Sequence, residues 1–176
     1  MSHTVRSTVP KFNASSMIGL NVILINTVIK FEGVDEIIIP SLEELSKVAA
    51  VKRCFLIQRL LPNELKAIRK ICGWSRINLL ETMGLNNLIS EVELWESEEN
   101  SIPEVIEKLF RIVVWSHLHR ETPGVFDQLE FILSKKFITN KDSNPPRMEF
   151  YRTKFIHDGK HKMVWTTECE PYSIVG

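Results

Sequence analysis

Apolar residues recur every three or four positions through the middle of the chain, which is the spacing of side chains on one face of a helix. A first helix begins at Pro62, whose missing N–H would have no partner in an opening turn, and ends near Gly73. A second helix begins after Ser75, whose hydroxyl can cap its first turn, and ends at Gly84. A third helix covers about residues 88–97. The stripes that these helices bury are Leu65, Ile68 and Cys72, then Leu79, Leu80 and Met83, then Ile89, Val92 and Trp95.

The segment before these helices favours strands. β-Branched residues cluster in two runs, residues 22–29 and 37–39, which predicts a hairpin. A helix follows from Ser41, because Ser41 and Glu44 match the capping-box pattern S-x-x-E. Residues 1–15 are rich in Ser and Thr and have few apolar anchors, so we expect a mobile tail there.

A second capping-box pattern, from Ser101 to Glu104, predicts the start of a helix with a wide apolar face. Such a face exceeds what one small domain usually covers. Two explanations are open: the helix is buried in the core of its own chain, or part of the face forms a homodimer interface. The residues of that interface would be Phe110, Val114, Trp115 and Leu118.

The C-terminal part combines a helical pattern with a second hairpin. Helical spacing resumes over residues 125–137, residues 140–146 form a linker, and residues 150–167 form a hairpin that turns at Asp158 and Gly159. We therefore predict a mainly α fold with small β additions, of the α+β class. Its parts are a tail at 1–15, a β-hairpin plus helix at 16–58, a helical domain at 59–120, and a helix with a β-hairpin at 121–176.

The three-helix segment has an ordered set of residues that carries a family resemblance. The set is Glu64-Leu65, Ile68-Arg69, Gly73-Trp74-Ser75-Arg76, Leu79, Gly84-Leu85, Val92 and Trp95-Glu96. It resembles the Cro and phage-repressor (XRE) class of helix-turn-helix regulators, which includes the DNA-binding domains of MqsA-type antitoxins. The resemblance covers about residues 18–120 and implies a lambda-repressor-like helix-turn-helix core with an N-terminal strand-bearing segment.

The resemblance assigns the DNA contacts to the second and third helices. Arg76 stands where the class commonly has Gln, and it can donate to a phosphate. Base readout would rest on Asn86, Asn87 and Ser90, because the carboxylate of Glu93 accepts only from cytosine and repels phosphates. The expected DNA-binding residues are Ser75, Arg76, Asn86, Asn87, Ser90 and Glu93.

The resemblance also implies a structural ion pair. In this class an Arg near the end of the first helix commonly pairs with the Glu that closes the recognition helix, and these positions are Arg69 and Glu96. A guanidinium can bind a carboxylate through two parallel hydrogen bonds, which would tie the first helix to the third. The alternative is that both are ordinary surface charges.

Charge along the chain is uneven although it sums to zero, from 22 Lys and Arg against 22 Asp and Glu. Residues 62–120 have seven basic and nine acidic residues, whereas residues 135–162 have eight basic and three acidic residues, a net charge of +5. The basic segment therefore lies outside the helix-turn-helix. It is either a solvated face that balances the acidic middle or a surface that keeps contact with phosphates possible.

No catalytic motif is evident. The three cysteines, Cys54, Cys72 and Cys169, are widely separated and include no CxxC pair, which argues against a disulfide framework and a zinc site. His117 and His119 point in different directions on a helix, and the chain has no Gly-rich phosphate loop or nucleophile motif. We expect no enzyme activity, cofactor or metal. The apolar run at residues 17–29 is too short for a membrane span, so we expect a cytoplasmic protein without membrane contact.

Two functions follow from these patterns. In the first, the chain is a sequence-directed transcriptional regulator, such as an antitoxin-like repressor, that binds double-stranded DNA as a homodimer because one module covers only a half-site. In the second, the helix-turn-helix fold has lost DNA binding and its acidic face binds another protein, such as a toxin. Arg76 and the basic segment at residues 135–162 favour the first function, because both can contact phosphate.

Overall fold

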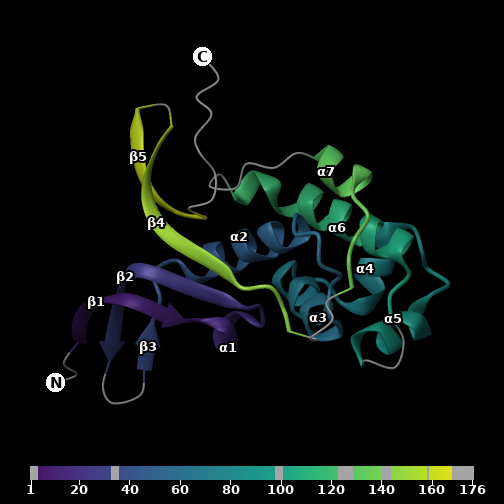
Figure 1. Ribbon diagram of the computed structural model, residues 1–176, viewed down its shortest axis with the longest axis horizontal. Helices are drawn as coiled ribbons and strands as arrows, with labels where there is room; N and C mark the ends of the chain where they lie inside the picture. Colours follow the sequence, from purple (N-terminus) through teal and green to yellow (C-terminus); the bar gives the residue numbers. More distant parts are fainter. Residues whose placement is uncertain are drawn as a thin grey trace.

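A five-stranded mixed sheet occupies one end of the molecule and most of the helices occupy the other (Figure 1). The computed structural model describes residues 4–32, 36–97, 101–122, 129–139, 144–157 and 159–167. In these residues the strand order is β1-β2-β4-β5, and β3 also pairs with β2. The strands are β1 (Thr4–Asn13), β2 (Val22–Glu32), β3 (Glu36–Ile38), β4 (Met148–His157) and β5 (Lys160–Thr166).

Strand β2 organises the sheet. Along one edge it pairs antiparallel with β1, from Asn13↔Ile23 to Thr4↔Glu32, and the short helix α1 (Ser15–Ile18) connects the two strands. Its other edge is shared by β4, which pairs in parallel with residues 22–24, and by β3, which pairs antiparallel with residues 30–32. Segments from both ends of the chain therefore meet on β2.

This sheet overturns the expected mainly α fold with small β additions. Among the described residues, 46% are helical and 28% are in strands, which makes the protein an α+β fold with a sizeable sheet. The predicted hairpins are present, but the parallel pairing of β2 with β4 joins them into one sheet. That pairing involves three residues of each strand and leaves no local signal in the sequence.

Residues 4–13, which we expected in a mobile tail, form the edge strand β1. The strand is polar because most of its side chains are exposed. Pro10 and Lys11 lie within it, and both residue types are typical of edge strands, since Pro lacks an N–H to donate and Lys discourages pairing with another chain.

The helices follow the segments expected from the apolar pattern. They are α2 (Leu42–Cys54), α3 (Pro62–Ile71), α4 (Arg76–Met83), α5 (Ile89–Glu96), α6 (Glu104–Leu118), the 3-10 helix η1 (His119–Glu121) and α7 (Leu129–Ser134). Helix α2 lies between the sheet and the other helices, and it contacts β5, α3 and α6 (Figure 1). Helix α2 therefore connects the sheet to α3 and α6.

The ends of α4 agree with the expected signals. The hydroxyl of Ser75 accepts from the N–H of Asn78 at 3.0 Å, and Gly84 adopts a left-handed conformation, with φ +70°, at the end of the helix.

The two expected capping boxes are not formed. Ser41 stands at the N-cap of α2 with φ +50° and makes no side-chain cap bond, and the N-cap of α6 is Pro103 rather than Ser101. The carboxylate of Glu44 instead lies 3.4 Å from the backbone N–H of Trp165, so a contact with β5 replaces the local bond.

The wide apolar face of α6 is covered within the chain. Phe110 and Val114 are fully buried and Leu118 is 1% exposed, all three in the main hydrophobic core. Trp115 is half-buried and packs against the same core. Of the two explanations that the sequence left open, burial in the chain's own core applies to these residues, so this face gives no reason to expect a homodimer.

The C-terminal elements are described in part. Helix α7 is shorter than the expected helix at residues 125–137, and its expected first residues, 125–128, lie outside the described residues, as do residues 140–143 of the linker. Strands β4 and β5 pair as far as His157↔Lys160, and Gly159 between them has φ +72°. Asp158, the other expected turn residue, lies outside the described residues.

Candidate nucleic-acid interface

A buried ion pair fixes the position of α5. Arg69 in α3 binds Glu96 at the end of α5 through two hydrogen bonds, Nε to Oε1 at 2.5 Å and Nη2 to Oε2 at 3.0 Å. The remaining Nη1 donates to the carbonyl of Trp74, in the turn before α4, at 2.8 Å. The two side chains are only 9% and 1% exposed. One guanidinium therefore connects α3, the α3–α4 turn and α5, as the resemblance implied.

The charge of Glu96 is maintained in this buried position. Burial opposes the ionised form, but hydrogen bonds from Arg69 and Arg76 outweigh it and hold the pKa of the carboxyl below its usual range. Glu96 is therefore a carboxylate with two cationic partners, which restricts the rotation of α5 relative to α3.

Arg76, the expected phosphate contact, is paired with carboxylates of α5. Its Nε donates to Glu96 Oε2 at 3.0 Å, and its Nη1 donates to Glu93 Oε1 at 3.1 Å. The Arg76 side chain is 36% exposed and that of Glu93 is 66% exposed. Sequence reasoning did not anticipate that two of the expected DNA-binding residues, Arg76 and Glu93, would bind each other.

The other expected DNA-binding residues form an exposed polar surface at the start of α5. Asn86 and Asn87 are exposed in the turn between α4 and α5, and Ser90 is exposed in the first turn of α5. Ser75 is also exposed, but its hydroxyl is occupied by Asn78, from which it accepts one bond and to which it donates another. A face with two amides and a hydroxyl offers both donors and acceptors to a partner.

The charge of this face is negative. Helices α4 and α5 contain one basic residue, Arg76, and four acidic residues, Glu81, Glu91, Glu93 and Glu96. Two large apolar side chains are also exposed there, Ile77 at 53% and Ile89 at 49%. The expected burial of Ile89 beside Val92 and Trp95 is therefore wrong, because Ile89 opens α5 and only the latter two side chains are buried. The face can therefore make hydrogen bonds and apolar contacts, but it supplies little positive charge.

An open groove of about 600 Å³ lies beside α5, between its start and the start of α6. Its lining is mainly apolar and includes Leu88, Trp95 and Ile106, together with the acidic Glu91. Val105 on the same groove is 77% exposed. This groove was not expected from the sequence, because its two sides come from different helices.

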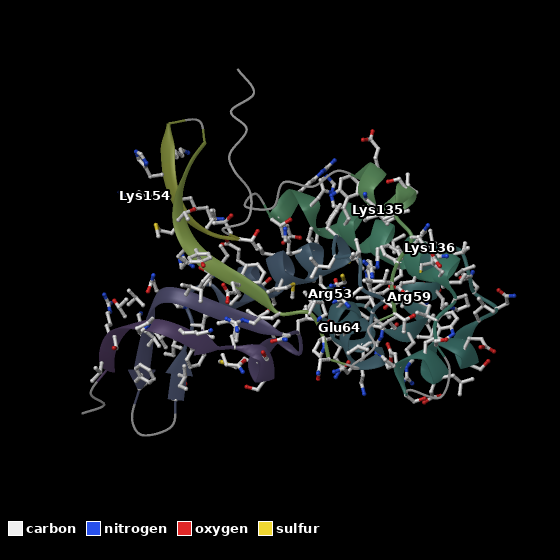
Figure 2. The ribbon with its side chains drawn as sticks, viewed as in Figure 1. Arg53, Arg59, Glu64, Lys135, Lys136 and Lys154 are labelled. Carbon is white, nitrogen blue, oxygen red and sulfur yellow. The ribbon has the colours of Figure 1, made fainter. Side chains whose placement is uncertain are left out.

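The interior beneath the helices contains a network of buried arginines and glutamates that the sequence analysis missed. Arg53 in α2 binds Glu64 in α3 through bonds of 2.6 and 2.7 Å (Figure 2), and its Nη2 also donates to the backbone carbonyl of Arg59 at 2.8 Å. Arg111 in α6 binds Glu107 at 2.6 Å and donates to three backbone carbonyls, those of Cys54, Leu56 and Gln58. A signal existed for Arg111 and Glu107, because they are four residues apart on the apolar face of α6.

The basic segment at residues 135–162 does not form one surface. Lys135 and Lys136 lie beside the helices, where a bridge between Gln58 and Ile138 holds their segment, whereas Lys154 projects from β4 at the far side of the molecule (Figure 2). Lys160 and Lys162 follow on β5 and are exposed. In the described part of this segment, these lysines therefore lie in two places, neither of which is on α4 or α5.

The histidines and cysteine considered for catalysis are packed against aromatic rings or buried in the core. The His119 ring stacks on Trp115, and the His117 ring lies tilted against Trp74, with ring centroids 4.8 Å apart in each pair. Burial raises the pKa of the Cys54 thiol to about 12, so it is not a reactive thiolate. Within the described part of the chain, no cluster of three or more His, Cys, Asp or Glu side chains could hold a metal ion.

Comparisons of the chain with protein-family models, with curated proteins and with solved structures found no match. Across the residues that the structure describes, no helix is both long and apolar enough to cross a membrane.

Proposed function

We propose that the chain is a sequence-directed DNA-binding regulator of transcription that reads duplex DNA with α4 and α5. The observation that carries the proposal is the buried pair of Arg69 and Glu96, which holds α5 against α3 while the start of α5 stays exposed. Buried ion pairs add little net stability, and their best-attested use is to specify one arrangement of elements. The resemblance to the XRE class supports the same assignment, because a recognition helix contacts base edges with its N-terminal residues.

The exposed amides would supply the base readout. A carboxamide both donates and accepts, so Asn86 or Asn87 can bind N6 and N7 of one adenine in the major groove. The Ser90 hydroxyl can bind any base edge within reach. Because α5 is short, two copies of the chain on two half-sites are expected, although no interface between copies is assigned.

The phosphate contact would require a change at Arg76. Its bond to the exposed Glu93 can open without disturbing the bond to the buried Glu96. Nη1 would then be free to donate to a phosphate, while Nε still orients the guanidinium. Because Glu93 competes with phosphate for Arg76, it weakens nonspecific binding to DNA. Affinity then depends more on the specific contacts at the start of α5.

The proposal is tested by selecting duplexes from a random-sequence library and sequencing those that the full chain retains. We expect an enriched motif, which Asn87→Ala broadens without abolishing binding. The matched control is Ser16→Ala on α1, an exposed polar residue far from α5 in sequence, which should enrich the original motif. Retention of no motif by the parent chain, or the same motif with equal affinity for Asn87→Ala, would contradict the proposal.

A second function is favoured by the negative charge of α4 and α5. The pairing of Arg76 with Glu93, the exposed side chains of Ile77 and Ile89, and the apolar groove beside α5 suit a basic, partly apolar protein surface. A toxin encoded next to this chain would be such a partner. Co-purification of the two proteins that is lost in Ile89→Glu, together with no enrichment of any duplex, would favour this function over DNA binding.

A further inference from the structure

Strands β4 and β5 continue beyond the sheet as a two-stranded ribbon (Figure 1). Strand β4 pairs with β2 only over residues 148–150, whereas its remaining seven residues pair with β5, from Tyr151↔Thr166 to His157↔Lys160. At about 3.3 Å per residue, that part of the ribbon extends roughly 20 Å. It is long enough to contact a partner that does not touch the rest of the sheet.

The base of the ribbon is fixed to the body of the protein. The indole N–H of the buried Trp165 donates to the carbonyl of Pro40 at 3.0 Å, and Arg152 donates to the same carbonyl at 3.2 Å. The Arg152 guanidinium also lies 5.1 Å from the centre of a Trp165 ring. The backbone N–H of Met148 donates to the carbonyl of Asn21 at 2.9 Å. These contacts set the direction in which the ribbon projects.

Exposed lysines lie on both faces of the ribbon. Lys160 and Lys162 share one face, because side chains two residues apart in a strand point the same way. Lys154 lies on the opposite face, where it is directly across from Met163. Lys162 stays 66% exposed although its Nζ is 3.8 Å from Glu44.

Acidic residues are few along the ribbon. Glu149 at the base is paired with Arg147, and the sequence adds Asp158 at the turn. Against these two acids the residues of β4 and β5 include four Lys and Arg, namely Arg152, Lys154, Lys160 and Lys162. The ribbon is therefore the projecting element whose charge is opposite to that of α4 and α5.

We infer that the ribbon is a second nucleic-acid-binding element, which enters a groove of duplex DNA and contacts the phosphates of both strands. The major groove of B-DNA, about 12 Å wide, admits a two-stranded β-ribbon, whereas the major groove of A-form RNA is deep and narrow. Positive charge on both faces suits an element with a phosphate backbone on each side. A ribbon lying on an anionic membrane would need its charge on one face only.

This inference does not depend on sequence recognition by α5. The ribbon and α5 lie at opposite ends of the long axis of the molecule (Figure 1), so they contact different stretches of DNA. The electrostatic part of DNA affinity grows with the number of phosphates that a protein neutralises. Because α4 and α5 have one basic and four acidic residues, that part must come from another element, and the ribbon offers four basic residues on a projecting element.

The test measures binding of the full chain to a labelled duplex of mixed sequence from about 50 to about 200 mM salt. Log affinity falls as log salt rises, and we expect the double variant Lys160→Gln, Lys162→Gln to make this fall less steep, reducing the magnitude of the slope by about 2. The double variant Lys11→Gln, Lys66→Gln removes the same charge from exposed lysines of β1 and α3 and should leave the slope unchanged.

A further single variant tests the use of both faces. Lys154→Gln should reduce the magnitude of the salt slope by about 1, and an unchanged salt slope would exclude insertion into a groove. Equal slopes for the two double variants, no binding by the parent chain, or tighter binding to an RNA duplex or to phosphatidylserine vesicles would overturn the inference.

Selection of duplexes by the double variant Lys160→Gln, Lys162→Gln separates this inference from the proposed function. An enriched motif with an unchanged salt slope would reject the ribbon and keep recognition by α5. A lowered slope with no enriched motif in the parent chain would keep the ribbon and reject recognition by α5.

Discussion

Replacement of Glu96 by Ala should strongly destabilise the fold. The substitution removes both acceptors of Arg69, whose Nε and Nη2 are buried and lose their partners together. It also removes the bond from Arg76 Nε. Only the bond from Arg69 Nη1 to the carbonyl of Trp74 would remain, so a guanidinium would stay buried without a counter-charge.

The expected magnitude follows from that burial. Removing one partner of a buried pair costs about 3–5 kcal/mol, which is a large part of the roughly 5–15 kcal/mol of unfolding free energy of a typical domain. Glu93→Ala is the matched control on the same helix. Its carboxylate is 66% exposed and binds the same arginine, Arg76, so its loss should cost about 0–1 kcal/mol.

Urea unfolding followed by circular dichroism measures both variants. With a denaturant dependence of about 1–3 kcal/mol/M, Glu96→Ala should lower the midpoint by roughly 2 M, and Glu93→Ala by less than about 0.5 M. Equal midpoints for Glu96→Ala and Glu93→Ala would refute the conclusion that the pair of Arg69 and Glu96 holds α5 in place.

The pKa of Glu96 is lowered below 4.5 in the folded chain, so its contribution to the unfolding free energy is present above pH 4.5 and is lost as the pH falls through the lowered value. Urea midpoints measured between neutral and acid pH should therefore fall less steeply in Glu96→Gln than in the parent chain. Arg111→Ala removes the arginine that donates to the buried carbonyls of Cys54 and Leu56 and one of the two arginines that bind the buried Glu107, so it should cost about 3–5 kcal/mol in urea unfolding. Lys108→Ala on the same helix, whose Nζ is 3.7 Å from Glu104, should cost less than about 1 kcal/mol, and similar values for the two variants would contradict the importance of the network. Glu93→Gln should raise affinity for the selected duplex by up to about tenfold at low salt, because it frees Arg76 Nη1 and removes a charge that repels phosphate. An anisotropy titration measures this affinity, and weaker binding would contradict the proposed phosphate contact.

The helices could be predicted because their signals are local. Apolar spacing, the Ser75 cap and the left-handed Gly84 each depend on a few neighbouring residues, and the structure places α3, α4 and α5 accordingly. The pair of Arg69 and Glu96 was expected only from the family resemblance, because nothing in the local pattern connects residues that far apart.

The sheet could not be predicted because its signals are either weak or distant. Strand β1 is an exposed edge strand, so its polar composition resembles that of a tail. The parallel pairing of β2 with β4 joins opposite ends of the chain. Glu44 shows the same effect on a smaller scale, since a distant backbone N–H, that of Trp165, outcompetes the capping bond that its local pattern predicts.

The charges of the site were misjudged for a related reason. Arg53 and Arg111 are fully buried, although charged residues are usually exposed unless they are paired. The carboxylate partner of Arg53 comes from another helix, and both arginines donate to backbone carbonyls of the loop at residues 55–60. Likewise, Arg76 was expected to be available for a phosphate, but it is paired with Glu93, which is near it only after α4 and α5 have packed.

The proposed function requires that the start of α5 contacts the bases of DNA. This contact can be measured by titrating the ¹⁵N-labelled chain with the selected duplex and following the amide chemical shifts. We expect the largest shift changes at Asn86, Asn87 and Ser90, with smaller changes on the β4–β5 ribbon. Changes confined to the ribbon, with the signals of these three residues unmoved, would contradict the proposed function.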